Sequence, residues 1–553
     1  MKINPSCRLC RRFVRSFSAA LALLLAFALV SPTRAQQTLG SLNGTVLDTS
    51  GAAIPSAKIT VVNTQTGLIR SVMSQQNGFF QVFNLPIGAY NVTVSHDGFD
   101  TTRLPAIQVQ EASAATVHVT LKVGHVSTSV TVTANPLINS TDTTNGYTLD
   151  KQQIALTPLA TGSFTQLAVL APGVNAELLS GLDTNAGLGN QPIWANGQRD
   201  TSNTFQVNGV DVSNIFNGKS SSGDTSQRYN FNIGGGSNSG TSDAGAANIG
   251  GANPVGTSVY GSNGNSLPSP PPQFITELRV NTSMYDAQQG ATSGAQIDVN
   301  TATGSNAYHG QVWSSFANNA MNASPFFFNQ AYQLSSQGIG AFPKSLVNPA
   351  LHRWTTGVSF GGPIKKNKLF FYVAYQYLHA SDQSTGLSQF SVPSGLTNDR
   401  SPAGLAAAAT EWAGGTAFDP AKIGPVALAI MNAKLPNGDY LIPSAQSQGP
   451  FQYGVPNVTL IGTSLMTGQQ ATAAIDYNWS DTDHLSLKYY YQDDPVSKPF
   501  NASDTAGFPE TQNNGAQVFS IDNTKSIGSK LNWEQRFGFA RESSYNYYKQ
   551  QDT

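Results

Sequence analysis

The stretch ATAAIDYNWSDTDHLSLKYYYQ, residues 471–492, decides the fold class of this protein. In its first half apolar residues alternate with mainly polar ones. One face carries Ala471, Ala473, Ile475, Tyr477 and Trp479, and the opposite face carries Thr472, Ala474, Asp476, Asn478 and Ser480. This period of two is typical of a β-strand, in which successive side chains point to opposite faces. The short polar turn at 481–483 then predicts an antiparallel hairpin.

The return strand of this hairpin has the same two faces. It places Leu485, Leu487, Tyr489 and Tyr491 on one side and Ser486, Lys488, Tyr490 and Gln492 on the other. Similar segments follow Tyr308, with a second hairpin at 353–378 and a final strand near Ile527–Phe539. Their length, about ten residues, suits a tilted transmembrane strand with one face toward lipid and the other toward a polar lumen. We therefore expect a transmembrane antiparallel β-barrel to occupy residues 307–553.

A soluble β-sandwich alternates in the same way and is the alternative to a membrane wall. The N-terminus favours the membrane, because residues 1–35 read as a signal peptide. Its positive residues are Lys2, Arg8, Arg11, Arg12 and Arg15, followed by an apolar run at 19–30 and a small-residue cleavage site ending at Ala35. An exported chain whose strands are separated by long polar excursions, such as 380–470, is typical of outer-membrane proteins. We expect the protein in the outer membrane, with its N-terminal domain in the periplasm.

Composition excludes several other classes. Charged residues are 11% of the 553, and 30 Lys and Arg balance 31 Asp and Glu, so no nucleic-acid partner is predicted. Aromatic residues are 10% of the chain, which argues against a long disordered polymer. The mean hydropathy is -0.20, and no apolar run reaches the roughly 18 residues of a membrane helix. Both cysteines, Cys7 and Cys10, lie in the predicted signal peptide, so no disulfide is expected in the mature chain.

Residues 39–123 predict a small β-sandwich. The candidate strands are 42–47, 58–62, 69–74, 79–85, 89–95 and 116–122, separated by turn residues such as Asn77-Gly78 and Asp97-Gly98. The ordered segments GTVLD (44–48), IPSA (54–57), NGFF (77–80) and LPIGAY (85–90) resemble the carboxypeptidase regulatory-like domain, a transthyretin-like sandwich. The resemblance implies an accessory domain and not a catalyst.

No catalytic site is predicted. A zinc carboxypeptidase needs a His-x-x-Glu pair, and none of the seven histidines has a glutamate three residues later. Gly218-Lys219-Ser220 resembles the end of a phosphate-binding loop, but Ser213 stands where that loop requires glycine. The chain shows no nucleophile–base set, metal cluster or cofactor-binding loop. We predict no enzyme activity, no metal and no cofactor.

Residues 137–306 have a different character and predict an α+β unit. Leu149–Leu170 is the most helical part, although Pro158 must break the helix. Asn208-Gly209 between apolar flanks predicts a tight hairpin. Further strands are expected at 275–281 and 295–300, and the Gly-, Ser- and Asn-rich insertion 217–266 reads either as a polar loop or as a binding surface.

Three ordered segments carry a second family resemblance. They are GQRDTSNTFQVNGVD (197–211), PPPQFITELRVNTSMYDAQQGATSGAQIDVNTATGSN (270–306) and YHGQVW (308–313). They resemble the plug and first barrel strand of TonB-dependent outer-membrane receptors of the Oar-like kind, and SFGGPIKKNKLFFYVAYQ (359–376) resembles the barrel of the same family. The resemblance implies a plug that blocks the barrel and an energised uptake of a large solute.

The linker GHVSTSVTVTANP, residues 124–136, has two readings. It can be a final strand of the sandwich, or a peptide that adds to another protein's sheet through main-chain hydrogen bonds. Within it, Val126–Ala134 resembles the TonB box that lies between such a sandwich and the plug in these receptors. The resemblance implies contact with TonB at Val126, Thr128, Val130, Thr131, Val132 and Thr133.

The predicted fold class is therefore mainly β: an N-terminal transthyretin-like β-sandwich, then an α+β plug, then the start of a transmembrane antiparallel β-barrel. About six to nine barrel strands are countable, whereas plugged transporters have about 22, so we expect an incomplete barrel and a longer parent chain. The implied partners are the TonB energy-transducing complex, outer-membrane lipid, the barrel assembly machinery and an extracellular solute, which could be an oligosaccharide, a peptide or a metal chelate. The alternative is a surface adhesin or carbohydrate-binding β-sandwich protein of the outer membrane.

Overall fold

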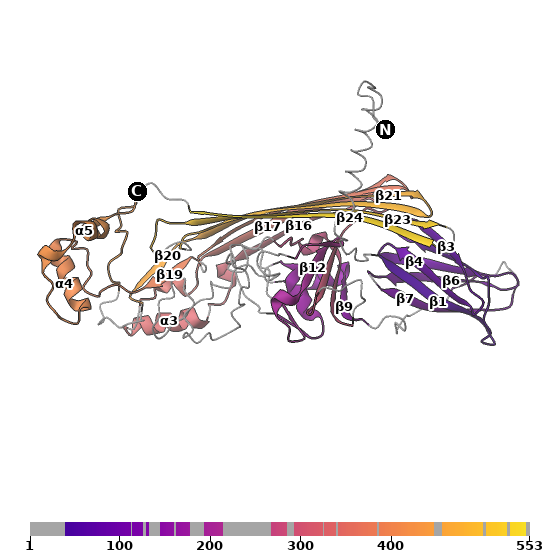
Figure 1. Ribbon diagram of the computed structural model, residues 1–553, viewed down its shortest axis with the longest axis horizontal. Helices are drawn as coiled ribbons and strands as arrows, with labels where there is room; N and C mark the ends of the chain where they lie inside the picture. Colours follow the sequence, from indigo (N-terminus) through magenta and orange to yellow (C-terminus); the bar gives the residue numbers. More distant parts are fainter. Residues whose placement is uncertain are drawn as a thin grey trace, which may run out of the picture.

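The computed structural model places three bodies next to one another: a small sandwich, a plug and a long curved sheet (Figure 1). It describes residues 39–111, 113–124, 129–131, 144–159, 162–176, 193–213, 267–284, 292–324, 326–338, 341–383, 386–446, 456–500, 505–527 and 531–548. The predicted signal peptide and the insertion 217–266 lie outside these ranges. No helix within them is long and apolar enough to cross a bilayer.

Two β-sheets pack against each other in the sandwich. The first has the order β4-β1-β7 and consists of β1 (Gly40–Asp48), β4 (Phe79–Leu85) and β7 (Ala114–Leu121). The second has the order β3-β2-β5-β6-β8 and consists of β2 (Lys58–Asn63), β3 (Ile69–Met73), β5 (Gly88–Ser95), β6 (Thr101–Val109) and β8 (Ser129–Thr131). Alternate apolar residues such as Val46, Phe80 and Val92 are buried between the sheets. Burial of these two apolar faces holds the sandwich together, as the alternation predicts.

Strand β6 is absent from the sequence prediction. Pro105 interrupts its pattern, and Ala106 has a φ of 54°, in the left-handed region. The pairing of β5 with β6 shifts register between Tyr90 and Val92, and the Asn91 side chain accepts a hydrogen bond from the Ala106 N–H at 3.1 Å. A β-bulge of this kind destroys the alternation on which strand prediction depends.

The plug is built on a five-stranded sheet with the order β13-β12-β15-β14-β9. Its strands are β9 (Asn145–Asp150), β12 (Thr204–Val207), β13 (Val210–Asp211), β14 (Ile275–Ser283) and β15 (Gln296–Thr301), with a separate pair β10 (Val174–Ala176) and β11 (Ile193–Ala195). The helical stretch is split around Pro158, as predicted, into α2 (Lys151–Leu156) and the 3-10 helix η1 (Phe164–Leu170). Asn208 and Gly209 have φ values of 53° and 73°, which confirms the tight turn between β12 and β13.

The third body, which we call the wall, is a seven-stranded antiparallel sheet with the order β16-β17-β18-β21-β22-β23-β24. Its strands are β16 (His309–Asn318), β17 (Leu351–Lys365), β18 (Leu369–Asp382), β21 (Ser464–Ser480), β22 (Asp483–Lys498), β23 (Glu510–Ile527) and β24 (Leu531–Tyr548). The two faces predicted for 471–480 are confirmed, since Ile475 and Trp479 are exposed while Ala474, Asp476 and Asn478 are buried against the plug side.

Two details of the wall differ from the prediction. β21 has 17 residues and β23 has 18, not about ten, because pairing continues beyond the apolar band to polar outward positions such as Gln469. Ile527 ends β23, so the strand predicted from that residue begins at Leu531 instead. Its outward residues are as predicted, with Trp533 and Phe537 exposed.

The connections between wall strands are short at one end and long at the other. Short turns join β17 to β18 and β21 to β22. At the opposite end, the connection between β18 and β21 contains β19 (Leu387–Phe390), α4 (Pro402–Trp412), η7 (Pro420–Lys422), α5 (Pro425–Asn432) and β20 (Val458–Ile461). The connection between β16 and β17 contains η5 (Asn319–Met321), α3 (Phe326–Ser336) and η6 (Lys344–Leu346). The sandwich lies at the short-turn end of the wall (Figure 1). This is the end that would face the periplasm if the wall is part of an outer-membrane barrel, because such barrels have short periplasmic turns and long external loops.

Candidate functional site: the interface between plug and wall

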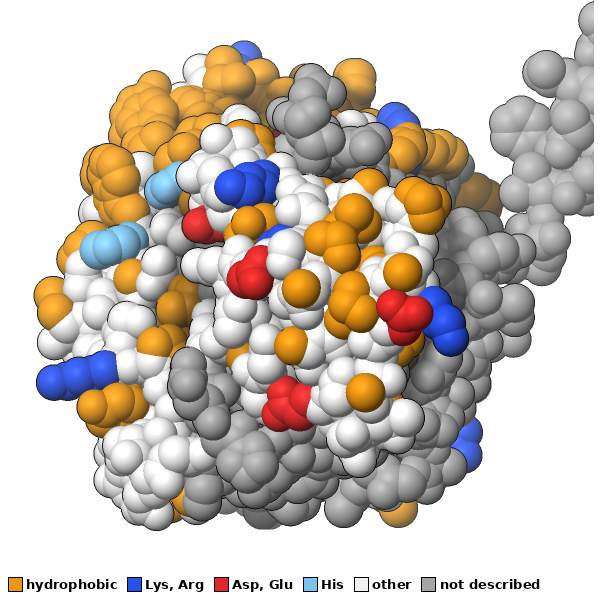
Figure 2. Space-filling model, turned by 90° about the vertical axis from the view of Figure 1, so that its left-hand side faces the viewer, with side chains coloured by type: hydrophobic (Ala, Val, Ile, Leu, Met, Phe, Trp, Pro, Cys, Tyr) orange, Lys and Arg blue, Asp and Glu red, His pale blue; other side chains and the backbone are white. Residues whose placement is uncertain are grey.

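The plug-facing surface of the wall is polar, with buried amides, hydroxyl groups and charged groups such as Asp476 and Asp494. In the view from the external-loop end, apolar side chains gather toward the upper edge, where the wall lies (Figure 2). Three glutamines on the inner face, Gln376, Gln470 and Gln492, are almost completely buried. Buried amides must find hydrogen-bond partners, because leaving one unpaired costs about 1–3 kcal/mol.

Together with Trp313 and Tyr490, these three glutamines form a continuous chain of hydrogen bonds, which we call the amide ladder. Its residues come from β16, β18, β21 and β22. The Trp313 indole N–H on β16 donates to Gln376 Oε1 at 2.9 Å, and Gln376 Nε2 donates to Gln470 Oε1 at 3.0 Å. Gln470 Nε2 donates to the Tyr490 hydroxyl at 3.0 Å, which donates to Gln492 Oε1 at 2.8 Å. Each donor is matched to an acceptor, so the ladder fixes the orientation of every amide.

The amide ladder binds one plug segment, Leu267–Ser269. Gln470 Nε2 donates to the Ser269 carbonyl at 2.6 Å, and the Ser269 N–H donates to Gln492 Oε1 at 2.8 Å. Prolines at 268 and 270–272 surround this serine and have no N–H, so Ser269 supplies the one main-chain donor of the run. The ladder therefore recognises the backbone of a segment that cannot pair as a normal strand.

A lysine makes a second contact between wall and plug. Lys488 Nζ on β22 donates to the Thr301 carbonyl at 3.2 Å and lies 3.5 Å from Asn208 Oδ1. The same Asn208 oxygen accepts the Thr301 N–H at 2.9 Å. The sequence predicted Asn208 as a turn residue, and the structure adds this link to the wall.

The sandwich touches the plug through one buried glutamate. The Glu111 N–H donates to Glu277 Oε1 at 2.8 Å, Asn300 Nδ2 donates to Glu111 Oε2 at 2.5 Å, and the Arg279 guanidinium donates to the Glu111 carbonyl. Burial raises the pKa of Glu277 to about 7 and that of Asp298 to about 6. Burial, with the charges of Asp298 and Glu277, also raises the pKa of Glu111 well above its ordinary value. We call these five residues the Glu111 node.

At the short-turn end of the wall, Asn306, which precedes β16, links the sandwich to the wall. The Asn306 N–H donates to the Gln65 carbonyl at 2.9 Å, and Asn306 Nδ2 donates to Asn367 Oδ1 at 2.7 Å. Asn367 lies in the β17–β18 turn and returns a hydrogen bond from its N–H to Asn306 Oδ1 at 2.7 Å. Gly67, beside Gln65, packs so closely that a Cβ there would lie 2.6 Å from Asn367 Oδ1.

The residues predicted to contact TonB are only partly described. Val126, Thr128, Val132 and Thr133 lie outside the described ranges. Val130 and Thr131 belong to β8, whose backbone pairs in parallel with Thr102 and Arg103 of β6 at the edge of the sandwich.

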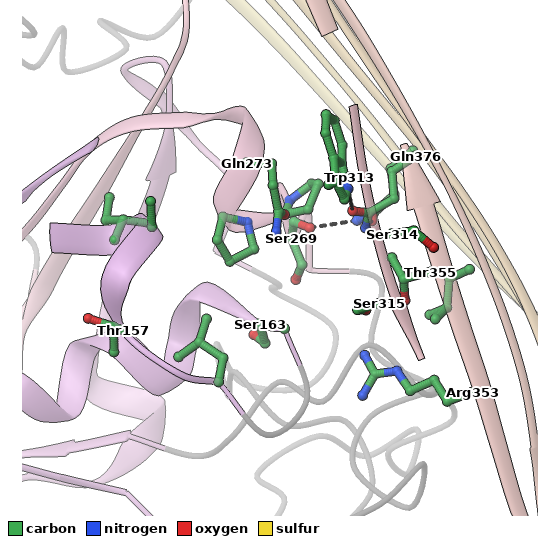
Figure 3. A pocket seen from close by; sticks show the side chains of 18 of the residues that line it. Thr157, Ser163, Ser269, Gln273, Trp313, Ser314, Ser315, Arg353, Thr355 and Gln376 are labelled. Carbon is green, nitrogen blue, oxygen red and sulfur yellow. Dashed lines mark hydrogen bonds between the residues drawn. The ribbon is translucent and has the colours of Figure 1, made fainter. Parts of the chain in front are cut away.

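A cavity of about 440 Å³ lies between plug and wall (Figure 3). The plug side includes Lys151, Thr157, Ser163, Ser269 and Gln273, and the wall side includes Gln311, Trp313, Ser315, Arg353 and Thr355. Arg353 extends from β17 toward the plug, and its Nη2 lies 3.6 Å from the position that a Cβ on Gly162 would take. No carboxylate occurs among the lining residues that the structure describes. In the same part of the chain, no group of three His, Cys, Asp or Glu residues is arranged to hold a metal ion.

Sequence reasoning placed Gln492 and Lys488 on the correct face of β22 but identified none of the contacts above. The ladder joins residues 94 positions apart, and Glu111 meets Asn300 189 positions away. A single sequence gives no signal for such pairs, because nothing local distinguishes these glutamines from other lumen-facing polar residues.

Comparison with known proteins agrees with this architecture. An outer membrane beta barrel domain matches residues 300–553, and a carboxypeptidase regulatory-like domain matches residues 41–122. The TonB-dependent transporter Oar of Myxococcus xanthus is 22% identical over 343 residues, which covers 60% of this chain and 26% of that protein. The chain thus spans about a quarter of the length of this relative.

Two solved structures are also similar. The outer membrane transporter YddB from Escherichia coli has a TM-score of 0.41 at 11% identity and is covered over 39% of its length by 73% of this chain. A ferric enterobactin receptor mutant from Pseudomonas aeruginosa (PfeA), in complex with enterobactin, has a TM-score of 0.33 at 10% identity, covering 72% of this chain and 46% of that one. The chain thus carries a region that matches an outer membrane beta barrel domain behind one that matches a carboxypeptidase regulatory-like domain, and over part of its length it is similar to the TonB-dependent transporter Oar.

Proposed function

We propose that this protein takes up a large external solute through the outer membrane in an energised, TonB-dependent manner, without catalysis. One observation carries the proposal. The segment resembling a TonB box precedes β9 in the chain, and among the described residues β9 is an edge strand of the plug sheet and pairs with β14 alone. A pull on this segment therefore reaches β9 before any other strand of the plug.

The contacts between plug and wall support a plug that can move. They include hydrogen bonds of uncharged amides, such as those of Gln470 and Gln492 with Leu267–Ser269, beside apolar packing of wall residues such as Val518 against the plug core. Exchange of such a bond for one to water changes the free energy by only about 1 kcal/mol. The polar part of the interface can thus separate one hydrogen bond at a time, and movement of the plug would also expose the apolar contacts of this interface to water.

The pairing of β8 with β6 is what the final-strand reading of this segment predicts, and it shows that these residues form an edge strand. Ser129–Thr131 lies at the edge of the five-stranded sandwich sheet. A partner that adds a strand through main-chain hydrogen bonds would use the same β-forming residues, with little demand on particular side chains.

The test uses the full-length protein in cells that lack other receptors of this kind. Deletion of Val126–Ala134 should abolish uptake that depends on the proton-motive force and should leave binding at the cell surface unchanged. The solutes would be a labelled panel of oligogalacturonate, maltodextrin, a tripeptide and a ferric chelate. Deletion of an equal length at 223–231, in the polar insertion, is the matched control and should preserve uptake.

Unchanged uptake after the first deletion would contradict the proposal. Binding to the cell surface with no energised uptake by the intact protein would support the adhesin alternative instead, which no observation in the structure favours.

A further inference from the structure

One residue of the sandwich is inserted into the plug. Glu111 lies between β6 and β7, and it is 2% exposed although its neighbour Gln110 is exposed. Its N–H donates to Glu277, its carbonyl accepts from Arg279, and a carboxylate oxygen accepts from Asn300. All three partners belong to β14 or β15 of the plug sheet. The plug therefore buries Glu111, and the two bodies cannot separate without exposing this residue to water.

Glu111 is attached to the part of the plug sheet that a pull on β9 reaches last. β9 pairs with β14 from Asn145 at its start to Asp150 at its end, where Asp150 is opposite Glu277. The chain enters β9 at Asn145, so separation of β9 from β14 by a pull on the linker begins there and ends at Asp150. Glu277 also pairs with Asn300 of β15, and both residues bond to Glu111. The sandwich thus holds the plug sheet at the end opposite to the pull.

The wall holds the same end of β15. Thr301 directly follows Asn300, and its carbonyl accepts a hydrogen bond from Lys488 Nζ of β22 at 3.2 Å. The N–H and the hydroxyl of Thr301 both donate to Asn208 Oδ1, at 2.9 and 3.0 Å. Sandwich and wall therefore bind neighbouring residues of one plug strand.

The sandwich is also attached to the wall itself. The Gln65 carbonyl accepts from the Asn306 N–H at 2.9 Å, and Asn306 and Asn367 of the β17–β18 turn bond to each other in both directions at 2.7 Å. The groups in this attachment are uncharged. The Glu111 node, in contrast, contains three buried acids, and separation of the sandwich from the plug returns them to water, where their ionisation costs least. Of the two attachments, the one at Glu111 is therefore the one that we expect to open.

We propose that the sandwich is a latch that keeps the plug seated. It is anchored to the wall through Gln65 and inserted into the plug at Glu111, so the Glu111 node has to separate before the plug can be displaced. The inference rests on the proposed uptake function for the origin of the pull, and it adds a step that precedes movement of the plug.

The test uses planar bilayers that contain the purified full-length protein, with ion flow at rising urea concentration as the measure of plug displacement. Glu111→Ala leaves the buried amide of Asn300 without its partner, so the seated plug should be disfavoured by about 5-fold to 100-fold relative to the displaced plug. Ion flow should then begin at a lower urea concentration. Asn300→Ala should act in the same direction, and the effect of the double variant should be smaller than the sum of the two, because both changes remove one bond. Asp97→Asn, at an exposed acid of the sandwich, is the matched control and should behave like the unmodified protein.

A second measurement keeps the latch testable if Glu111→Ala does not fold. Spin labels at Gln76→Cys on the sandwich and Arg199→Cys on the plug, both at exposed positions, report the distance between the two bodies in the otherwise unmodified protein. The distance distribution should broaden at or below the urea concentration at which ion flow begins.

Three results would overturn the latch: ion flow while the distance distribution is still narrow, a Glu111→Ala variant that opens at the urea concentration of the unmodified protein, or effects of the two substitutions that add in full. Neither measurement includes TonB or a solute, so each of these results leaves the uptake function untouched. A latch that behaves as expected in a protein without energised uptake in cells would contradict the uptake function alone.

Discussion

The carboxylate of Glu111 in the sandwich accepts a hydrogen bond from the side-chain amide of Asn300 in the plug at 2.5 Å, although 189 positions separate the two residues. Glu111 is 2% exposed and Asn300 is 4% exposed, so this contact is removed from water. The sandwich is therefore docked on the plug through a buried carboxylate that has two further acids near it.

Docking of the sandwich on the plug should weaken as the pH rises. Burial raises the pKa of Glu277 to about 7 and that of Asp298 to about 6. It also raises the pKa of Glu111 well above its ordinary value, while the charge of Arg279 partly opposes all three shifts. When a group has a higher pKa in the docked state than in the undocked state, it favours docking fully at low pH. This contribution to docking is lost as the pH rises through the raised pKa. We expect the loss to extend from about pH 5 to above pH 7.

Spin labels at Gln76→Cys on the sandwich and Arg199→Cys on the plug would measure this directly. The distance distribution between them should be narrow at pH 5.5 and broad at pH 8.5. Glu111→Gln should leave the distribution at pH 8.5 narrower than in the unmodified protein, since a neutral amide replaces one of the three buried acids while Glu277 and Asp298 still ionise. Asp97→Asn, at an exposed acid of the same sandwich, should behave like the unmodified protein. A distribution that narrows with rising pH would contradict the sign of this linkage.

Truncation of the amide ladder should loosen the plug. Gln470→Ala removes the donor to the Ser269 carbonyl and the acceptor of Gln376, which leaves buried groups unpaired at a cost of about 1–3 kcal/mol. In planar bilayers, the full-length variant should open to ion flow at a lower urea concentration than the unmodified protein.

Gln469→Ala is the control for Gln470→Ala. Gln469 directly precedes Gln470 in β21, but its side chain is exposed on the outer face of the wall. It should open at the urea concentration of the unmodified protein. Equal shifts for the two variants would mean that the ladder does not hold the plug.

The faces of the wall strands could be predicted from the sequence, but the contacts between bodies could not. Alternation at 471–479 fixes which side chains share a face, because that property needs only the geometry of one strand. The hydrogen bond between Gln470 and Ser269 depends on how the plug packs against the wall. The two residues are 201 positions apart in the sequence, so no local pattern indicates the contact. The strand at Thr101–Val109 was missed for a local reason, since Pro105 and the left-handed Ala106 interrupt the alternation.

Glycines at two turns of the sandwich should differ in their response to alanine. Gly67 has a φ of 72° and Gly98 a φ of 83°, so alanine strains both by about 1–2 kcal/mol. A Cβ at Gly98 meets nothing within 4 Å, whereas one at Gly67 would displace Asn367 Oδ1 and break its hydrogen bond from Asn306.

Calorimetry of the full-length protein would check this comparison. Gly67→Ala should lower the unfolding temperature of the sandwich more than Gly98→Ala does. Identical decreases would show that contact with the β17–β18 turn adds no stability to the sandwich.

The most direct test of the account is whether the wall separates lipid from a polar lumen along 471–479. The two cysteines of the chain, Cys7 and Cys10, precede the predicted cleavage site, so single cysteines at each of these nine positions can carry a spin label in the mature, full-length protein. In lipid vesicles, labels at the odd positions should collide with oxygen dissolved in the bilayer, and labels at the even positions should not. The account predicts that the rate of collision with oxygen alternates along the strand, high at odd positions and low at even ones. Equal access of a water-soluble relaxation agent to all nine positions would contradict it.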